Sequence, residues 1–170
     1  MLNRRPDLRP VNIRGNVETR LRKLEEEGLD ALVLAQAGLE RLDLAGQITE
    51  ILDRSWMLPA VGQGALGLEC RADDVATLSL LQQIDHRPTR QQVLAERALL
   101  RGLGGGCQVP VGAASEVIGE ELKLRGVVLH PDGGERIDQC LIGPLTEAVE
   151  LGQRLAEQLL SHGAKELLGK

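Results

Sequence analysis

The sequence lacks the aromatic and basic residues on which nucleic-acid binding usually depends. Its 170 residues include no Phe, no Tyr and a single Trp, so platforms for stacking bases are missing. Lys and Arg number 20 against 25 Asp and Glu, a formal net charge of −5. No basic field is therefore available to offset a phosphate backbone. We expect no nucleic-acid partner and a core built from aliphatic side chains.

Long apolar runs are also missing. No run approaches the roughly 18 residues that a membrane span needs, and no signal-peptide pattern opens the chain. The sequence therefore predicts a cytoplasmic protein with no membrane partner.

Cysteine is scarce, with only Cys70, Cys107 and Cys140. An odd number at wide spacing argues against a disulfide framework and against zinc binding of the CxxC type. We predict no metal site, and we expect Cys70 and Cys140 to be small buried hydrophobic residues.

The first part of the chain alternates predicted strands with a predicted helix. Residues 10–13 and 29–35 are apolar runs typical of strands. Between them, Asn16 is a good N-cap, an apolar stripe indicates a helix to about residue 27, and Gly28 ends it. This pattern predicts a βαβ unit with a parallel strand pair, which needs further strands to be stable.

The rest of the chain has a different pattern. Residues 58–71 predict a glycine-rich loop running into a strand, and two helices follow, one capped by Asp73 and one from Pro88 to Gly102. Three strand-like runs then alternate with turn residues, at 109–117, 121–130 and 135–142, before an amphipathic helix over 145–160. The predicted class is α/β and α+β: a partial parallel βαβ domain followed by a small three-stranded antiparallel sheet packed with helices.

Two arginines flank the turn into the first helix. Arg14 lies at the end of the predicted strand, and Arg20 follows inside the first helical turns. Ligands of open α/β sheets bind beyond the carboxyl ends of strands, where the positive helix end favours anions. Guanidinium groups there suit carboxylates or phosphates. A solvated basic face that continues through Arg22 and Lys23 remains an alternative.

Two glycine-flanked residues are further candidates. Cys107 follows Gly104-Gly105-Gly106, which keeps bulk away from its sulfur, although a tight turn with an incidental cysteine fits the spacing equally well. Gln63, between Gly62 and Gly64, lies in a turn that brings backbone close to a ligand or only reverses the chain.

The remaining titratable side chains give weaker signals. We expect surface or structural roles for the histidines, and cap or surface roles for three acidic residues, namely His86, His130 and His162, and Glu69, Asp73 and Asp74.

Four ordered blocks of the sequence are similar to porphobilinogen deaminases. They are Ile13-Arg14-Gly15-Asn16-Val17-Glu18-Thr19-Arg20-Leu21, Ala35-Gln36-Ala37-Gly38-Leu39-Glu40-Arg41-Leu42, Leu58-Pro59-Ala60-Val61-Gly62-Gln63-Gly64-Ala65-Leu66-Gly67 and Gly105-Gly106-Cys107-Gln108-Val109-Pro110. Ala95-Glu96-Arg97 and His162-Gly163-Ala164-Lys165 also fit. The resemblance covers nearly the whole chain.

The resemblance implies a transferase of tetrapyrrole, haem and chlorophyll biosynthesis, a hydroxymethylbilane synthase. Enzymes of this family join four porphobilinogen molecules on a dipyrromethane cofactor, releasing ammonia each time. By motif, Cys107 holds that cofactor through a thioether, and Arg14 and Arg20 bind carboxylates of cofactor and substrate. Arg41 and Gln63 match further residues of the substrate cleft. The implied partners are porphobilinogen and the growing linear polypyrrole, and the full-length enzyme is expected to be a monomer.

The resemblance also implies a domain division. Residues 1–58 would be the remainder of the second domain, 59–84 a segment returning to the first, and 85–170 a C-terminal α+β domain that carries the cofactor cysteine. No residue matches the family's catalytic aspartate, so no catalytic residue is assigned and we expect the chain alone to be inactive. The alternatives are a non-catalytic polyanion-binding module and a purely structural fragment.

Overall fold

The computed structural model describes residues 1–106 and 109–169. These residues form two compact units. One comprises Asp7–Asp53, and the other combines Met1–Pro6 with Arg54–Lys170. We describe each unit by itself.

The unit of residues 7–53 is built around helix α1, Val17–Glu26. The Asn16 side chain caps the helix, as predicted, by accepting a hydrogen bond from the Thr19 N–H at 2.8 Å. Gly28 ends it with a φ of 61°. The N–H groups of Gly28 and the next residue then bond back to the last helical turn, the pattern of a Schellman motif.

Helix α2, Gln36–Arg41, and a 3₁₀ turn, Ala45–Gln47, follow in the same unit. Residues 10–13 and 29–35, predicted as strands, are irregular and belong to no ladder in the described structure. A strand needs a neighbour to satisfy its N–H and C=O groups, and an isolated parallel pair is marginal. The helix of the predicted βαβ unit is therefore confirmed, and its strand pair is not formed.

The second unit begins with an irregular stretch and two helices. Helix α3 is Val75–Ile84 and helix α4 is Arg87–Gly102, with a proline in the first turn as predicted. Asp74, rather than the predicted Asp73, caps α3, because its side chain lies within 3.0 Å of the Thr77 N–H. The strand predicted within residues 58–71 is likewise not formed.

The predicted three-stranded antiparallel sheet is confirmed. Its strands are β1 (Val111–Ile118), β2 (Glu121–Leu129) and β3 (Arg136–Pro144), in the order β1-β2-β3. Ile118 pairs with Glu121, so the first hairpin has a two-residue loop, and Gly119 adopts the positive φ of 62° that such tight turns favour. The fold class expected for this region, helices packed with a small antiparallel sheet, is therefore present.

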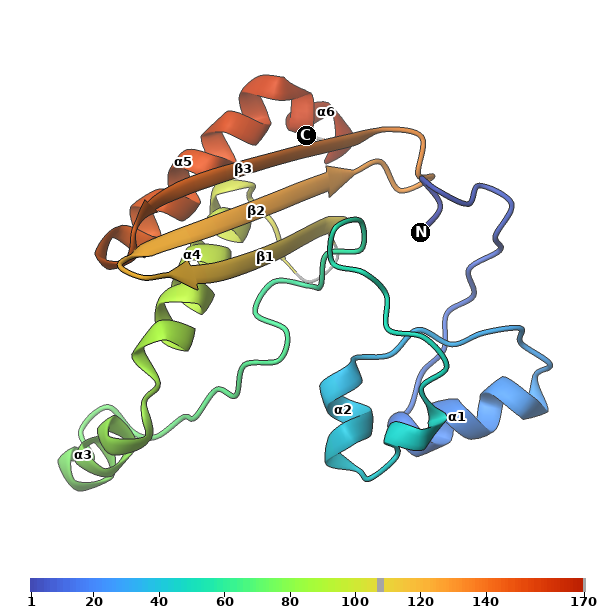
Figure 1. The fold of residues 1–170 in the computed structure, drawn as a ribbon, viewed down its shortest axis with the longest axis horizontal. Coiled ribbons are helices and arrows are strands. Elements are labelled where there is room, and N and C mark those ends of the chain that lie inside the picture. The colour runs from blue at the N-terminus through green and yellow to red at the C-terminus, as the bar shows by residue number, and fades with distance from the viewer. Residues whose placement is uncertain (107–108, 170) are drawn as a thin grey trace. The chain divides into compact units, whose positions relative to one another are not determined.

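Two helices cover one face of this sheet (Figure 1). They are α4 and α5, Ala148–Leu159, which follows a 3₁₀ turn at Leu145–Glu147. Beyond α5 the chain continues through a wider turn, Leu160–Ala164, into the short helix α6, Lys165–Leu167. The fully buried side chains are aliphatic, as the composition predicts, and include Leu99, Leu103, Leu122, Leu124, Leu151, Leu155, Leu159 and Val128.

Residues 54–62 lie against the edge and the other face of the sheet. The Ala113 N–H of edge strand β1 donates to the Pro59 carbonyl at 3.0 Å. A Cβ atom on Gly112 would lie 2.9 Å from Cβ of Leu58, so the glycine permits this close approach. The segment therefore satisfies part of the open edge of β1.

Candidate functional site

The turn that carries Arg14 and Arg20 is closely packed. Gly15 has a φ of 127°, and a Cβ atom there would lie 2.7 Å from the Thr19 methyl group. The Arg20 Nε–H donates to the Gly15 carbonyl at 2.8 Å. This bond orients the Arg20 side chain back along the helix toward the turn. Arg14 lies at that turn and is exposed.

The charge of this turn is suited to anions. In the described part of the chain, no carboxylate forms an ion pair with Arg14, Arg20 or Arg41, whereas Arg22 pairs with Glu26 at 3.4 Å. The N-terminal end of α1 adds partial positive charge from its free N–H groups. The two cations next to it are thus available to an external carboxylate.

Arg41 is the last residue of α2 in the same unit, and its side chain is exposed. The helix is anchored by Leu39, which is buried. The structure therefore places Arg14, Arg20 and Arg41 within residues 7–53, on or next to its two α-helices. Gln63 belongs to the other unit.

Gln63 lies in a tight, self-bonded turn. Its N–H donates to the Ala60 carbonyl at 3.0 Å, and its side-chain Oε1 accepts from the Ala60 N–H at 3.3 Å. Gly62 and Gly64 have φ angles of 70° and 88°, which other residues rarely adopt. The sequence identified this turn, but it did not show what holds the turn in place.

A buried carboxylate holds it. Glu96 of α4, 9% exposed, accepts a hydrogen bond from the Gly62 N–H at 2.8 Å and another from the Ser115 hydroxyl at 2.5 Å. A cavity of about 230 Å³ adjoins this contact and is lined by residues that include Gln63, Thr89 and Gln92. From the sequence, Glu96 was identified only as a member of the Ala95-Glu96-Arg97 block. The signal that could have identified it as a buried residue is a charged side chain next to the apolar stripe of an amphipathic helix.

Cys107, the predicted cofactor residue, lies outside the described residues. The chain leading to it is described: α4 ends at Gly102, and Gly104 has a φ of 64°. Of the other cysteines, Cys70 is partly exposed and Cys140 is exposed. The expectation that both are buried was therefore wrong. Cys140 lies on β3, an edge strand of the sheet.

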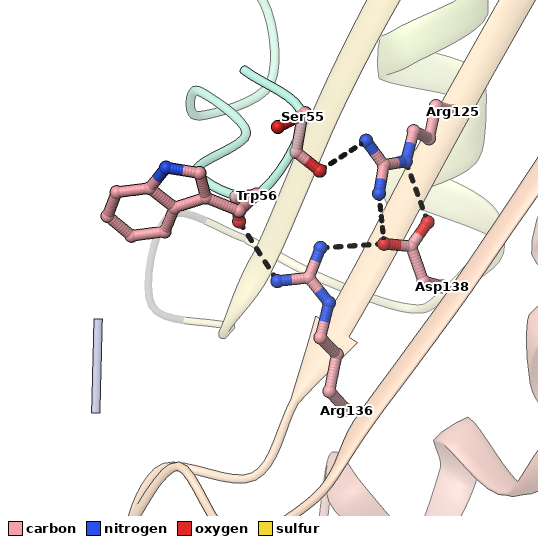
Figure 2. Close-up of polar contacts among 5 residues, drawn as sticks. All are labelled: Ser55, Trp56, Arg125, Arg136 and Asp138. Carbon is pink, nitrogen blue, oxygen red and sulfur yellow. Dashed lines mark hydrogen bonds and ion pairs between the residues drawn. The ribbon is translucent and has the colours of Figure 1, made fainter. Parts of the chain in front are cut away.

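An ionic cluster on the sheet was not foreseen from the sequence (Figure 2). Arg125 donates through Nε and Nη2 to both carboxylate oxygens of Asp138, at 2.8 and 2.6 Å, and through Nη1 to the Ser55 carbonyl at 2.8 Å. Arg136 bridges Asp138 at 2.6 Å and the Trp56 carbonyl at 2.9 Å. The cluster thus ties residues 55 and 56 to strands β2 and β3.

The electrostatics of the cluster favour an ionised Asp138. Partial burial acts to raise the pKa of Asp138, but hydrogen bonds from Arg125 and Arg136 outweigh it and hold the pKa below its ordinary value of 3.8. A depressed pKa stabilises the fold above the unfolded-state pKa. This contribution is lost as the pH falls through the lower, folded-state pKa.

We predict that Asp138→Asn lowers the free energy of unfolding by about 2 kcal/mol at pH 7, because two guanidinium groups lose their shared carboxylate. The difference from the unsubstituted chain should shrink as the pH falls through the lowered, folded-state pKa of Asp138, because the carboxyl group is then protonated in the unsubstituted chain as well. Urea unfolding followed by the fluorescence of Trp56, the only Trp, measures the free energy of unfolding at pH 7 and at low pH. Asp73→Asn, at an exposed carboxylate, is the control. A difference that stays constant with pH would contradict this account.

Two other features are absent from residues 1–106 and 109–169. No group of three or more His, Cys, Asp or Glu side chains is arranged to hold a metal ion there. No helix in those ranges has the length and apolar content needed to cross a bilayer.

The comparisons with known proteins agree with the motifs. Residues 1–79 match the family model described as "Porphobilinogen deaminase, dipyromethane cofactor binding domain", and residues 90–161 match "Porphobilinogen deaminase, C-terminal domain". Both models describe one enzyme family, and the first model is named for a dipyrromethane cofactor. The chain belongs to the porphobilinogen deaminase family.

Individual relatives support this assignment along the whole chain. The chain is 50% identical over 168 residues to the porphobilinogen deaminase of Trichlorobacter lovleyi, covering 99% of this chain and 54% of the relative. It is 54% identical over 164 residues to that of Pelotomaculum thermopropionicum, covering 96% and 53%. It is 52% identical over 168 residues to the porphobilinogen deaminase of Syntrophotalea carbinolica, covering 99% of this chain and 53% of the relative. The chain therefore spans about half the length of these curated relatives.

Proposed function

We propose that this chain supplies the carboxylate-binding arginines and the cofactor cysteine of a hydroxymethylbilane synthase. In the proposed reaction, four porphobilinogens are joined head to tail on a dipyrromethane, and each addition releases ammonia. The observation that carries the proposal is the turn at Gly15, where two arginines adjoin a helix N-terminus and pair with no carboxylate among the residues that the structure describes. Every pyrrole unit brings an acetate and a propionate, so the site must hold several anions.

The residues present fit such a ligand. Arg20 uses its Nε–H within the turn, and among the described residues its two terminal nitrogens have no hydrogen-bond or ion-pair partner, so they can form a bidentate carboxylate bond. Arg14 and Arg41 are exposed cations of the same unit. When bound, the dipyrromethane would supply the growing end of the polypyrrole. The protein's part is to neutralise and orient its carboxylates.

Cys107 is the proposed attachment point, through a thioether between its sulfur and the dipyrromethane. The support for this role comes from the motif Gly105-Gly106-Cys107, which lies within the match to the family's C-terminal domain, and from membership of a family that has a model named for the dipyrromethane cofactor. Gln63 is also a proposed substrate-binding residue. The proposed division is residues 1–58 as part of a second domain, 59–84 as a connecting segment and 85–170 as a C-terminal domain.

We also propose a cytoplasmic, monomeric full-length enzyme whose partners are porphobilinogen and the growing linear polypyrrole. The chain spans about half the length of its relatives. The 170-residue polypeptide by itself is expected not to turn over porphobilinogen. Release of ammonia or hydroxymethylbilane by the purified chain would contradict this expectation.

The experiment that tests the cofactor assignment is intact mass spectrometry of the chain, purified from cells that make porphobilinogen, with peptide mapping. We expect a mass excess of one two-pyrrole unit on the peptide that contains Cys107. Cys70 and Cys140 are internal controls, because both are free thiols with some exposure. Cys107→Ser should abolish the adduct. An adduct on either control cysteine, or none at all, would contradict the assignment.

A further inference from the structure

Glu96 is a buried charged group for which the proposed chemistry has no use. It is 9% exposed on the helix face that also carries Ala95 and Leu99, both fully buried. Its two oxygens accept hydrogen bonds from the Gly62 N–H and the Ser115 hydroxyl. No cation forms an ion pair with it in the described part of the chain. Burying a carboxylate is costly unless such bonds replace its hydration, so the two bonds define where the group must lie.

The bond to Gly62 is made at the centre of the Gln63 turn. Gly62 precedes Gln63 directly and adopts a φ of 70°. The turn's own bonds, between Ala60 and Gln63, set its local shape. They do not fix its position relative to α4. The bond from Gly62 to Glu96 joins residues 34 apart in sequence and supplies that position.

A second side chain of α4 strengthens the same attachment. Gln92 lies one helical turn before Glu96 and donates through Nε2 to the Ser115 carbonyl at 2.8 Å. Ser115 is therefore held through its carbonyl by Gln92 and through its hydroxyl by Glu96. Because Ser115 belongs to strand β1, α4 joins the edge of the sheet and the Gln63 turn into one rigid frame.

We infer that Glu96 is a positioning residue that holds the Gly62-Gln63-Gly64 turn at the wall of the adjoining cavity. That cavity, about 230 Å³, is lined by Gln63 and Gly64 from the turn, by Thr89, Gln92 and Glu96 from α4, and by Ser115. The inference rests on the proposed function in one respect, namely that Gln63 contacts the pyrrole chain. In this role Glu96 does not need to touch the ligand. It acts by fixing the main chain on which Gln63 is presented.

The test compares Glu96→Ala with Glu96→Gln in the whole chain. In Glu96→Gln the amide oxygen still accepts from Gly62, and the amide NH₂ can donate to the Ser115 oxygen. In Glu96→Ala both bonds are lost. We expect hydrogen exchange at the Gly62 amide to rise at least about 10-fold in Glu96→Ala and to stay near the unsubstituted rate in Glu96→Gln. Trp56 fluorescence in urea separates this local opening from any global loss of stability.

Ser115→Ala is the matched control. It removes the other partner of Glu96 and leaves the Gly62 bond intact, so exchange at Gly62 should change much less than in Glu96→Ala. An unchanged Gly62 rate in Glu96→Ala would overturn the inference. So would a Gly62 rate in Glu96→Gln as fast as that in Glu96→Ala, because an acceptor for the Gly62 N–H would then be present without holding the turn.

Binding of porphobilinogen, measured by calorimetry, distinguishes this inference from the proposed function. We expect Gln63→Ala and Glu96→Ala to weaken binding to similar extents, with Glu96→Gln close to the unsubstituted chain. If Gln63→Ala weakens binding and Glu96→Ala does not, the positioning role is wrong and the proposed site stands. If Gln63→Ala has no effect and Gly62 still opens in Glu96→Ala, the site assignment of Gln63 is wrong while the attachment by Glu96 stands.

Discussion

Gly152→Ala is expected to lower the free energy of unfolding by about 2–3 kcal/mol, although it adds only one methyl group. Gly152 lies inside α5, where that helix meets α4. A Cβ atom there would overlap the Ala95 carbonyl oxygen and would lie 2.7 Å from Cβ of Ala98 and 2.9 Å from the Leu99 nitrogen. Two of these three atoms are main-chain atoms, which cannot move aside as a flexible side chain can.

The sign of this prediction depends on two opposing effects. In an exposed helix interior, Ala is favoured over Gly by about 1 kcal/mol. At Gly152 the two helices must separate to admit the methyl group, and the leucines that fill the space beneath them, such as Leu99 and Leu155, then lose contacts. Overpacking typically costs about 1–3 kcal/mol and sometimes more, and the overlap with main-chain atoms places Gly152 at about 3–4 kcal/mol before the helix-propensity gain is subtracted. The packing cost therefore exceeds the gain in helix propensity.

Urea unfolding monitored by Trp56 fluorescence measures the effect, because Trp56 belongs to the same unit as the helices. Gly67→Ala is the control, since a Cβ atom at Gly67 meets nothing within 4 Å. The Gly67→Ala substitution should leave the urea concentration at the midpoint of unfolding unchanged or raise it slightly. Equal stability of Gly152→Ala and the unsubstituted chain would show that α4 and α5 pack less closely than described.

The elements predicted correctly from the sequence are those fixed by nearby residues. Asn16 and Gly28 define the ends of α1 through bonds made within a few residues. The hairpin at Gly119 is likewise set by local turn chemistry. The predicted strands at 10–13 and 29–35 failed for the opposite reason. An apolar run becomes a strand only beside another strand, and the described residues of that unit offer none.

The missed parts of the candidate site depend on contacts between distant residues. Glu96 reaches Gly62 across 34 positions, and Arg136 reaches Trp56 across 80. Neither pair shows a periodicity or spacing that a single sequence could reveal. Arg14 and Arg20 could be predicted because one local turn places both.

Arg14→Ala and Arg20→Ala are each expected to weaken the binding of porphobilinogen by about 10- to 100-fold, since a hydrogen bond to a charged partner contributes about 1.5–3 kcal/mol. Titration calorimetry of the chain measures this loss. Arg20→Lys keeps the charge but loses the planar fork, and it should recover only part of the affinity. The Nε–H of Arg20 also bonds the Gly15 carbonyl, so circular dichroism should confirm that α1 remains folded.

Arg22→Ala provides the matched control for charge. Arg22 lies on the same helix and already pairs with Glu26 at 3.4 Å. Its removal changes the net charge as much as either test substitution. We expect it to weaken binding less than about threefold, because an exposed ion pair contributes little. Losses in Arg22→Ala equal to those in Arg14→Ala would mean that the helix attracts anions only through its overall charge.

The dependence of affinity on ionic strength provides an independent test between direct carboxylate binding by Arg14 and Arg20 and attraction by the overall charge of the helix. A diffuse basic field is screened over about 8–10 Å at physiological salt, so the affinity it provides falls steeply as salt is added. A carboxylate held directly by Arg14 and Arg20 lies within hydrogen-bond distance, where screening is weaker. The ratio of affinities between the unsubstituted chain and the Arg14→Ala,Arg20→Ala double variant should therefore stay above about tenfold at high salt. A ratio that falls to one would assign the attraction to the solvated basic face of α1.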